Sequence, residues 1–210
     1  PGNEPVGNDM MTNVENFKNL HEGKRLFILA SGPSLGSLNL APLQKRISMG
    51  LNRSPKIFPD THYHCVMDQR LFDVCPELLK TSRYFFTLEN RPWGIPLKLL
   101  GAEGFSWDLT KGIYSGYTVS YFAIQVAVYM GFKEIYFLGL DLKHDGSQTH
   151  FFGYDFHSHT HEETEFPRMR KMLCYGADIL ANTDIKIFNC SENSSLGCFP
   201  KVSYEYAISL

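Results

Sequence analysis

The chain has 210 residues and a mass of 24.0 kDa, which fits one domain or one domain with an appended lid. Hydrophobic residues make up 43% and charged residues 20%, a balance that excludes a largely disordered chain. Lys and Arg number 20 against 22 Asp and Glu, so the near-neutral charge argues against a broad basic face, and we expect no nucleic-acid partner.

We expect residues 1–23 to form an N-terminal arm and residues 24–210 to form a single domain. Within that domain, short apolar runs typical of strands buried on both faces alternate with turns and helical segments. The predicted strands are residues 25–30, 47–52, 63–68, 84–88, 134–139 and 185–189. Helices are predicted at residues 118–130 and 166–182. This alternation predicts an α/β fold, a Rossmann-like, doubly wound and mostly parallel sheet of about six to seven strands with a lid segment.

Cysteine usage and hydropathy indicate the compartment. The five cysteines form no CxxC pair, which favours reduced thiols and a cytoplasmic protein. The first 19 residues are polar, so we expect no signal peptide. The longest apolar stretch, residues 118–132, contains Gln125 and is too short to cross a bilayer. We therefore expect no membrane span.

The turn after the first predicted strand reads SGPSLG, and such sheets bind ligands at the carboxyl ends of their strands. Gly32 permits a close approach of the backbone, and Pro33 fixes the turn. Ser31 and Ser34 offer hydroxyls, and free amides before a helix attract a phosphate or a ribose. The Gly-Lys-Ser/Thr of a Walker loop is absent. A strand-to-helix turn without a ligand is the alternative.

Polar residues also follow the other predicted strands. Asn52 can pair with a base or sugar edge, or can make an Asx turn. Asp68 can bind a ribose or a metal, or can cap a helix. Ser115 and Gly116 lie in KGIYSGYT ahead of the first predicted helix and form a second anion-friendly cradle. Asp141 again follows a strand, so these residues are expected to meet at one edge of the sheet.

The densest cluster of ionisable groups lies in residues 143–166, which we expect to form a lid over the strand ends. The candidate catalytic residues in this segment are Lys143, His150, His157, His159 and His161. Three of these histidines occupy alternate positions, so on a strand they would share one face. The pattern favours a general base or a metal site, with a solvated polar loop as the alternative. Because no spaced partner cluster accompanies it, no resident metal is expected.

Taken in order, several segments resemble a known family: RLFILASGPSL, GLNR, KGIYSGYTVSYFAIQVAVYMGFKEIYFLGLDL, THFFG and KIFNCSENSSLGCFPKVSYEYAI. They resemble the bacterial hydroxymethylpterin diphosphokinase-like proteins, many of which lie in capsule and lipopolysaccharide pathways. They are also similar to small bacterial sialyltransferases, which carry Gly-Pro-Ser-Leu, an Asn at a strand end, and Ser-Gly before a helix. The resemblance covers roughly residues 24–206 and is most specific between Ser115 and Asp141.

The resemblance implies a set of nucleotide contacts. The matching residues are Ser31, Gly32, Pro33, Ser34, Asn52, Ser115, Gly116 and Asn193. Asp68 stands where the sialyltransferases have a second Asn, and it is included with Asp141 among the candidate nucleotide-binding residues.

The resemblance also implies catalytic positions, with departures. Of the two tyrosines that hold the donor phosphate in sialyltransferases, one matches Lys143 and the other matches Thr149 or His150. The catalytic His of their lid matches Tyr154 or His157. These departures affect the prediction of a CMP-sialic acid donor more than they affect the prediction of nucleotide binding.

The function implied by the resemblance is that of a nucleotide-sugar-dependent glycosyltransferase of surface polysaccharide or lipopolysaccharide synthesis. A CMP-sugar is the favoured donor, and a glycan is the acceptor. In an inverting transfer, a lid His takes the acceptor proton, and Lys143, His150 or the cradle amides stabilise the leaving phosphate, so no cofactor is required. The expected location is cytoplasmic, with peripheral association at the inner membrane left open, and a homo-oligomer is expected because related sialyltransferases associate.

Two alternatives remain open at this point. The first is a diphosphokinase that uses Mg-ATP on a hydroxymethylpterin-like acceptor, with Asp68 and Asp141 as magnesium ligands. The second is a non-catalytic nucleotide-binding module.

Overall fold

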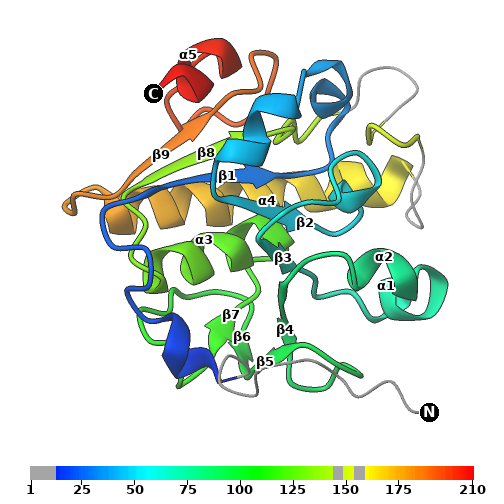
Figure 1. Cartoon of the computed structure of the whole chain (residues 1–210), viewed down its shortest axis with the longest axis vertical. Coiled ribbons are helices and arrows are strands. Elements are labelled where there is room, and N and C mark those ends of the chain that lie inside the picture. The colour runs from blue at the N-terminus through cyan, green and yellow to red at the C-terminus, as the bar shows by residue number, and fades with distance from the viewer. Residues whose placement is uncertain (1–12, 144–148, 154–158) are drawn as a thin grey trace.

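The computed structural model describes residues 13–143, 149–153 and 159–210, with the backbone alone for residues 159–163. A parallel sheet of seven strands forms its centre (Figure 1). The strands are β1 (Arg25–Leu29), β2 (Ser48–Leu51), β3 (Tyr63–Cys65), β4 (Tyr84–Leu88), β5 (Ile95–Leu97), β8 (Glu134–Leu138) and β9 (Lys186–Asn189). Their order in the sheet is β5-β4-β3-β2-β1-β8-β9. This arrangement confirms the predicted α/β, Rossmann-like sheet, and the six predicted strands all form.

The sheet is buried on both faces, which explains why its strands read as continuous apolar runs. On β1, Leu26 and Ile28 pack into one core, whereas Phe27 and Leu29 pack into another on the opposite face. The first core is covered by α3 (Val119–Tyr129), α4 (His159–Leu180) and the short helix η2 (Val14–Phe17). The second core is covered by η3 (Pro33–Ser37), η4 (Ala41–Lys45) and α5 (Tyr204–Ser209).

The remaining elements lie around these layers. The helices α1 (Gln69–Val74) and α2 (Pro76–Leu79) pack with Val66 and Phe85 into a third, smaller core. Between β2 and β3 lies η5 (Ser54–Lys56). A separate parallel pair, β6 (Leu99–Gly101) and β7 (Ile113–Tyr114), precedes α3. No helix in the described part of the chain is long and apolar enough to cross a bilayer.

Two boundaries differ from the sequence expectation. Residues 13–23 are not a loose arm, because Phe17 is fully buried and the amides of Asn19 and His21 donate to the carbonyls of Tyr129 and Met130. The second predicted helix begins at His159 instead of residue 166, so the expected lid segment ends in helix. Its apolar pattern weakens in that first part, which is why the periodicity placed its start too late.

Candidate functional site

A cavity of about 420 Å³ opens at the carboxyl ends of β1, β2, β3, β4 and β8. The chain runs from β1 outward to β5 on one side and continues through β8 on the other side. The cavity therefore lies at the point where the strand order reverses, the position at which open α/β sheets bind their ligands. The N-terminal end of α3 and three residues of α4 complete its wall.

The structure divides the predicted site residues between this cavity and a second one. The first cavity is lined by Ser31, Gly32, Asn52, Asp68, Ser115, Asp141 and His150. The adjoining second cavity, of about 350 Å³, is lined by Pro33, Ser34, Asp141, Lys143 and Asn193. Asp141 belongs to both walls, so the two cavities meet at the end of β8. Lys143 and His150 thus lie in different cavities, although we expected both in one lid.

Gly116 lines neither cavity. Its φ of +56° lies in the left-handed region, and a Cβ there would sit 2.3 Å from the ring of Tyr121. The close packing of Tyr121 therefore explains this glycine without a ligand.

The turn after β1 is built around the carboxylate of Asp141. Ser34 donates its amide to Asp141 Oδ2 at 2.9 Å and its hydroxyl to Asp141 Oδ1 at 2.6 Å. Gly32 donates its amide to the carbonyl of Gly139 at 2.8 Å. The amides that we expected to be free for an anion are therefore used within the protein, and an acidic side chain faces them. The expectation of an anion cradle at this turn is wrong for Gly32 and Ser34.

His150 lies at the wall of the first cavity, beside the end of β1. Its Nδ1 is 3.1 Å from Ser31 Oγ, and the amide of the next residue, Phe151, donates to the carbonyl of Ser31 at 2.9 Å. The imidazole stacks on the ring of Phe152, with 4.9 Å between centroids. This contact is compatible with the tautomer in which Nδ1–H donates to Ser31 Oγ and the ring lone pair lies on Nε2, the form that a general base needs.

Of the second predicted cradle, Ser115 lines the cavity together with the first residues of α3 and those just before it. Thr118 caps α3 by accepting a hydrogen bond from the amide of Ser120, and both residues line the wall. The amides of Tyr117 and Val119 make no hydrogen bond to other described residues. These two donors and the positive end of the α3 dipole favour a negatively charged group in this cavity.

Asn52 follows β2 with a φ of +48°, a conformation that Asn tolerates better than most residues. Its carbonyl lies 2.8 Å from Nε2 of His64, and its side-chain amide makes no hydrogen bond within the described ranges. Burial lowers the pKa of His64 to about 4, so this imidazole is neutral at pH 7. The polar tip of Asn52 is thus available to a ligand in the cavity.

Asp68 is the N-cap of α1. Helix capping was the alternative to a ribose or metal ligand that the sequence left open for this residue. Its carboxylate accepts from the amide of Arg70 at 3.0 Å and pairs with the guanidinium of the same residue at 2.6 Å. Asp141 is engaged by Ser34, and the described residues contain no group of three or more His, Cys, Asp or Glu that could hold a metal. Asp68 and Asp141, the two carboxylates of the diphosphokinase alternative, are thus both engaged within the protein, and magnesium would have to share them with Arg70 and Ser34.

Two charged residues of the wall were missed by the sequence analysis. Arg91 follows β4 and donates from Nε to the carbonyl of Met67 at 2.7 Å. It lies three residues beyond the strand end, so the rule that selected Asn52 would have found it. Glu165 lies in α4 and pairs with Arg168. No signal selected Glu165, because the helix was expected to start after it.

The remaining lid histidines are only partly covered by the structure. Tyr154 and His157 lie outside the described residues. His159 and His161 fall in the first part of α4, where the backbone alone is described. Because that backbone is helical, His159 and His161 do not lie on a strand, the conformation in which alternating histidines would share one face.

No family model matches the sequence, and no curated protein matches it. Solved structures do resemble the fold. The sialyltransferase CstII from Campylobacter jejuni, in complex with the substrate analogue cytidine-5'-monophosphate, is 17% identical, with a TM-score of 0.54 over 87% of this chain and 86% of that chain. CstII in complex with CMP-3FNeuAc is 12% identical, with a TM-score of 0.50 over 86% of each chain. At these identities, the likeness shows a shared α/β fold.

Proposed function

We propose that this protein is a sialyltransferase-like glycosyltransferase that takes its sugar from a CMP-sugar donor. The observation that carries the proposal is the cavity at the reversal of the strand order, whose wall combines the N-terminal end of α3, Asn52 and His150. Sialyltransferases of the same fold, in complex with CMP and with CMP-3FNeuAc, support the choice of donor. The pairing of Asp68 with Arg70 makes it a poorer magnesium ligand, which favours the transferase over the diphosphokinase alternative.

The donor spans the two cavities that meet at Asp141. The first cavity is lined by apolar residues together with Asn52 and the α3 amides, and the second contains the cationic Lys143. A phosphate held in the first cavity would face the positive end of α3, and Lys143 in the second cavity offsets the negative charge of Asp141 at the junction. Both groups stabilise the negative charge that develops on a leaving phosphate, so the transfer needs no metal.

In the proposed reaction, a lid His removes the proton from the acceptor hydroxyl. The acceptor oxygen attacks the anomeric carbon, the bond from that carbon to the phosphate oxygen breaks, and CMP leaves with the electron pair. His150 is the lid His with a described position at the cavity, and its Nε2 receives the proton in this scheme. The configuration at the anomeric carbon inverts, because the acceptor attacks from the face opposite the leaving group.

A thermal-shift panel with CMP, CDP, UDP and ATP, each with and without magnesium, tests the nucleotide. We expect CMP to stabilise the protein without magnesium, and Asn52→Ala to reduce the shift. Release of CMP from CMP-sialic acid in the presence of a glycan acceptor then tests transfer. Stabilisation by ATP alone, dependent on magnesium, would instead support the diphosphokinase, and nucleotide binding without transfer of any sugar would support a binding module.

A further inference from the structure

Basic residues mark the edge of the sheet opposite the donor cavities. Lys24 precedes β1 and Arg25 is its first residue, Arg46 precedes β2, and Lys133 precedes β8. The strands are parallel and adjacent, and Arg25 is in register with Glu134. The amide of Lys133 donates to the carbonyl of Lys24 at 3.0 Å, so these amino-terminal strand ends lie side by side.

A cavity of about 380 Å³ lies at this edge, separate from the two donor cavities. Its ionisable lining residues are Lys24, Arg25, Lys45, Arg46, Lys133 and Glu134. Five cations and one carboxylate therefore share one hollow of a chain whose overall charge is −2. Like charges held this close repel one another, and an anion in the hollow relieves that repulsion.

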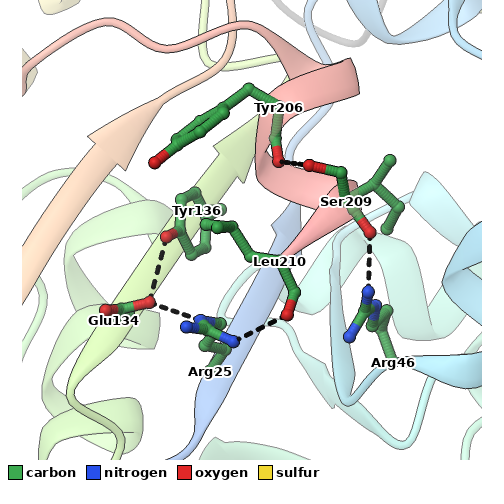
Figure 2. Close-up of polar contacts among 8 residues, drawn as sticks. Arg25, Arg46, Glu134, Tyr136, Tyr206, Ser209 and Leu210 are labelled. Carbon is green, nitrogen blue, oxygen red and sulfur yellow. Dashed lines mark hydrogen bonds and ion pairs between the residues drawn. The ribbon is translucent and has the colours of Figure 1, made fainter.

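The neighbouring acceptors compensate only part of this charge. Arg25 pairs with Glu134 at 2.5 Å, and Lys133 pairs with Asp184 at 2.7 Å. Figure 2 shows Tyr136 donating to the same Glu134 carboxylate and Arg25 reaching the Leu210 oxygen at 3.0 Å. Within the part of the chain that the structure describes, these two ion pairs leave three of the five cations without a carboxylate partner.

The three remaining cations differ in how firmly they are held. Arg46 donates to the carbonyl of Ile208 at 2.6 Å, which fixes its guanidinium beside the C-terminal residues (Figure 2). Lys24 and Lys45 are exposed, and their side-chain ammonium groups make no hydrogen bond to other described residues. The hollow thus combines positioned guanidinium groups with two adjustable ammonium groups, the combination that suits a phosphate group.

We propose that this basic hollow is a binding site for a phosphate-bearing anion. The site is distinct from the donor cavities, because it lies at the amino ends of the strands and shares no lining residue with them. Either a soluble phosphate compound or an anionic lipid headgroup presents the required chemistry. The proposal does not depend on the proposed glycosyl transfer.

Titration calorimetry with inorganic pyrophosphate at low salt tests the soluble form of this ligand. We expect Lys24→Ala/Lys45→Ala to weaken binding about tenfold, and raised salt to weaken binding to the original protein. Lys98→Ala/Lys111→Ala is the matched control, because it removes the same charge from exposed positions outside the hollow. Lys143→Ala removes the cation of the second donor cavity, so pyrophosphate binding that is lost in this variant and kept in Lys24→Ala/Lys45→Ala would place the ligand in the donor cavities and overturn the assignment to the hollow.

Co-sedimentation with phosphatidylcholine vesicles that contain phosphatidylglycerol tests the lipid source with the same variants. Binding of either probe that is lost in Lys24→Ala/Lys45→Ala and kept in the control supports the site and identifies its source. Failure of both probes to bind would overturn the proposal. It would also be overturned if the Lys24→Ala/Lys45→Ala variant, folded by circular dichroism, bound a probe as tightly as the original protein.

Discussion

At the site, the backbone of Gly32 packs directly against the carboxylate of Asp141 and leaves no room for a side chain. A Cβ on residue 32 would lie 2.4 Å from Asp141 Oδ2 and 2.6 Å from the carbonyl oxygen of Gly139. Neither atom can easily retreat, because Asp141 is held by two hydrogen bonds from Ser34 and the carbonyl belongs to the backbone. Glycine at position 32 is therefore explained by packing, before any ligand is considered.

Gly32→Ala tests this account. We expect the substitution to lower the free energy of unfolding by about 1–3 kcal/mol, since the added methyl group must displace backbone or a fixed carboxylate. Urea denaturation measures the change. Gly197→Ala is the control, because a Cβ there meets nothing within 4 Å and its φ is unremarkable for an L-residue. Equal stability of the two variants would contradict the packing account.

The role of His150 makes a separate prediction about activity. If its imidazole is the base, His150→Gln should bind CMP as the original protein does and should transfer sugar about 100-fold or more slowly. His62→Gln is the matched control, because His62 is exposed at the amino end of β3, opposite the cavity. Full activity of His150→Gln would exclude His150 and direct the search to His157, His159 and His161.

Among the elements, α3 connects the cavity to the small sheet through one buried amide. Gln125 is fully buried in this helix. Its Oε1 accepts from the amides of Ser106 and Tyr114 at 3.0 and 3.2 Å, and its Nε2 donates to the carbonyl of Tyr114 at 2.8 Å. Gln125 therefore fastens the segment that leads from β6 into β7 and on to the α3 N-terminus.

Gln125→Leu removes this fastening at nearly constant size. We expect a loss of about 3 kcal/mol or more in the free energy of unfolding, because buried amides and a carbonyl lose their partner. Hydrogen exchange should also show faster exchange at Ser106 and Tyr114 than in the original protein. Gln44→Leu, the same change at an exposed position, should leave both measurements nearly unchanged. Unchanged exchange in Gln125→Leu would refute the fastening role.

The strands that the sequence predicts most directly are those whose burial is nearly complete. The runs that became β1, β4 and β8 are apolar at nearly every position, so their type follows from hydrophobicity alone. By contrast, β5 has three residues and contains the exposed Pro96, which is tolerated because β5 is at the edge of the sheet. Only its pairing with β4 defines β5 as a strand, and this pairing depends on the tertiary structure instead of on the local sequence.

The site was predictable to a similar, limited extent. The rule that ligands bind at strand ends selected Ser31, Asn52 and Asp141, all of which line the first cavity. The rule does not predict which polar atoms form hydrogen bonds within the protein and which remain for a ligand. The hydrogen bond from Ser34 to Asp141 joins residues 107 positions apart in the sequence. It depends on the pairing of β1 with β8, which the local sequence does not encode.

On the scale of the whole molecule, histidines that lose solvent on folding link stability to pH. His64 is fully buried in β3, with Nε2 near the Asn52 carbonyl and the ring edge-on to Phe85. Desolvation lowers its pKa from 6.5 to about 4. The pKa values of His21 and His62 are also lowered by burial. In each case the unfolded chain binds the proton more readily than the folded protein does, so acid favours unfolding.

The contribution of His64 can be separated from that of the other groups by comparing two proteins at two pH values. Above pH 6.5 the imidazole is neutral in both states, and between pH 6.5 and pH 4 the unfolded state alone takes up the proton. The original protein should therefore lose roughly 2–3 kcal/mol through His64 between pH 7 and pH 4.5. In His64→Gln this part of the loss should vanish, whereas the contributions of His21 and His62 remain. Urea denaturation of both proteins at the two pH values measures the difference, and parallel losses would show that His64 does not titrate in this way.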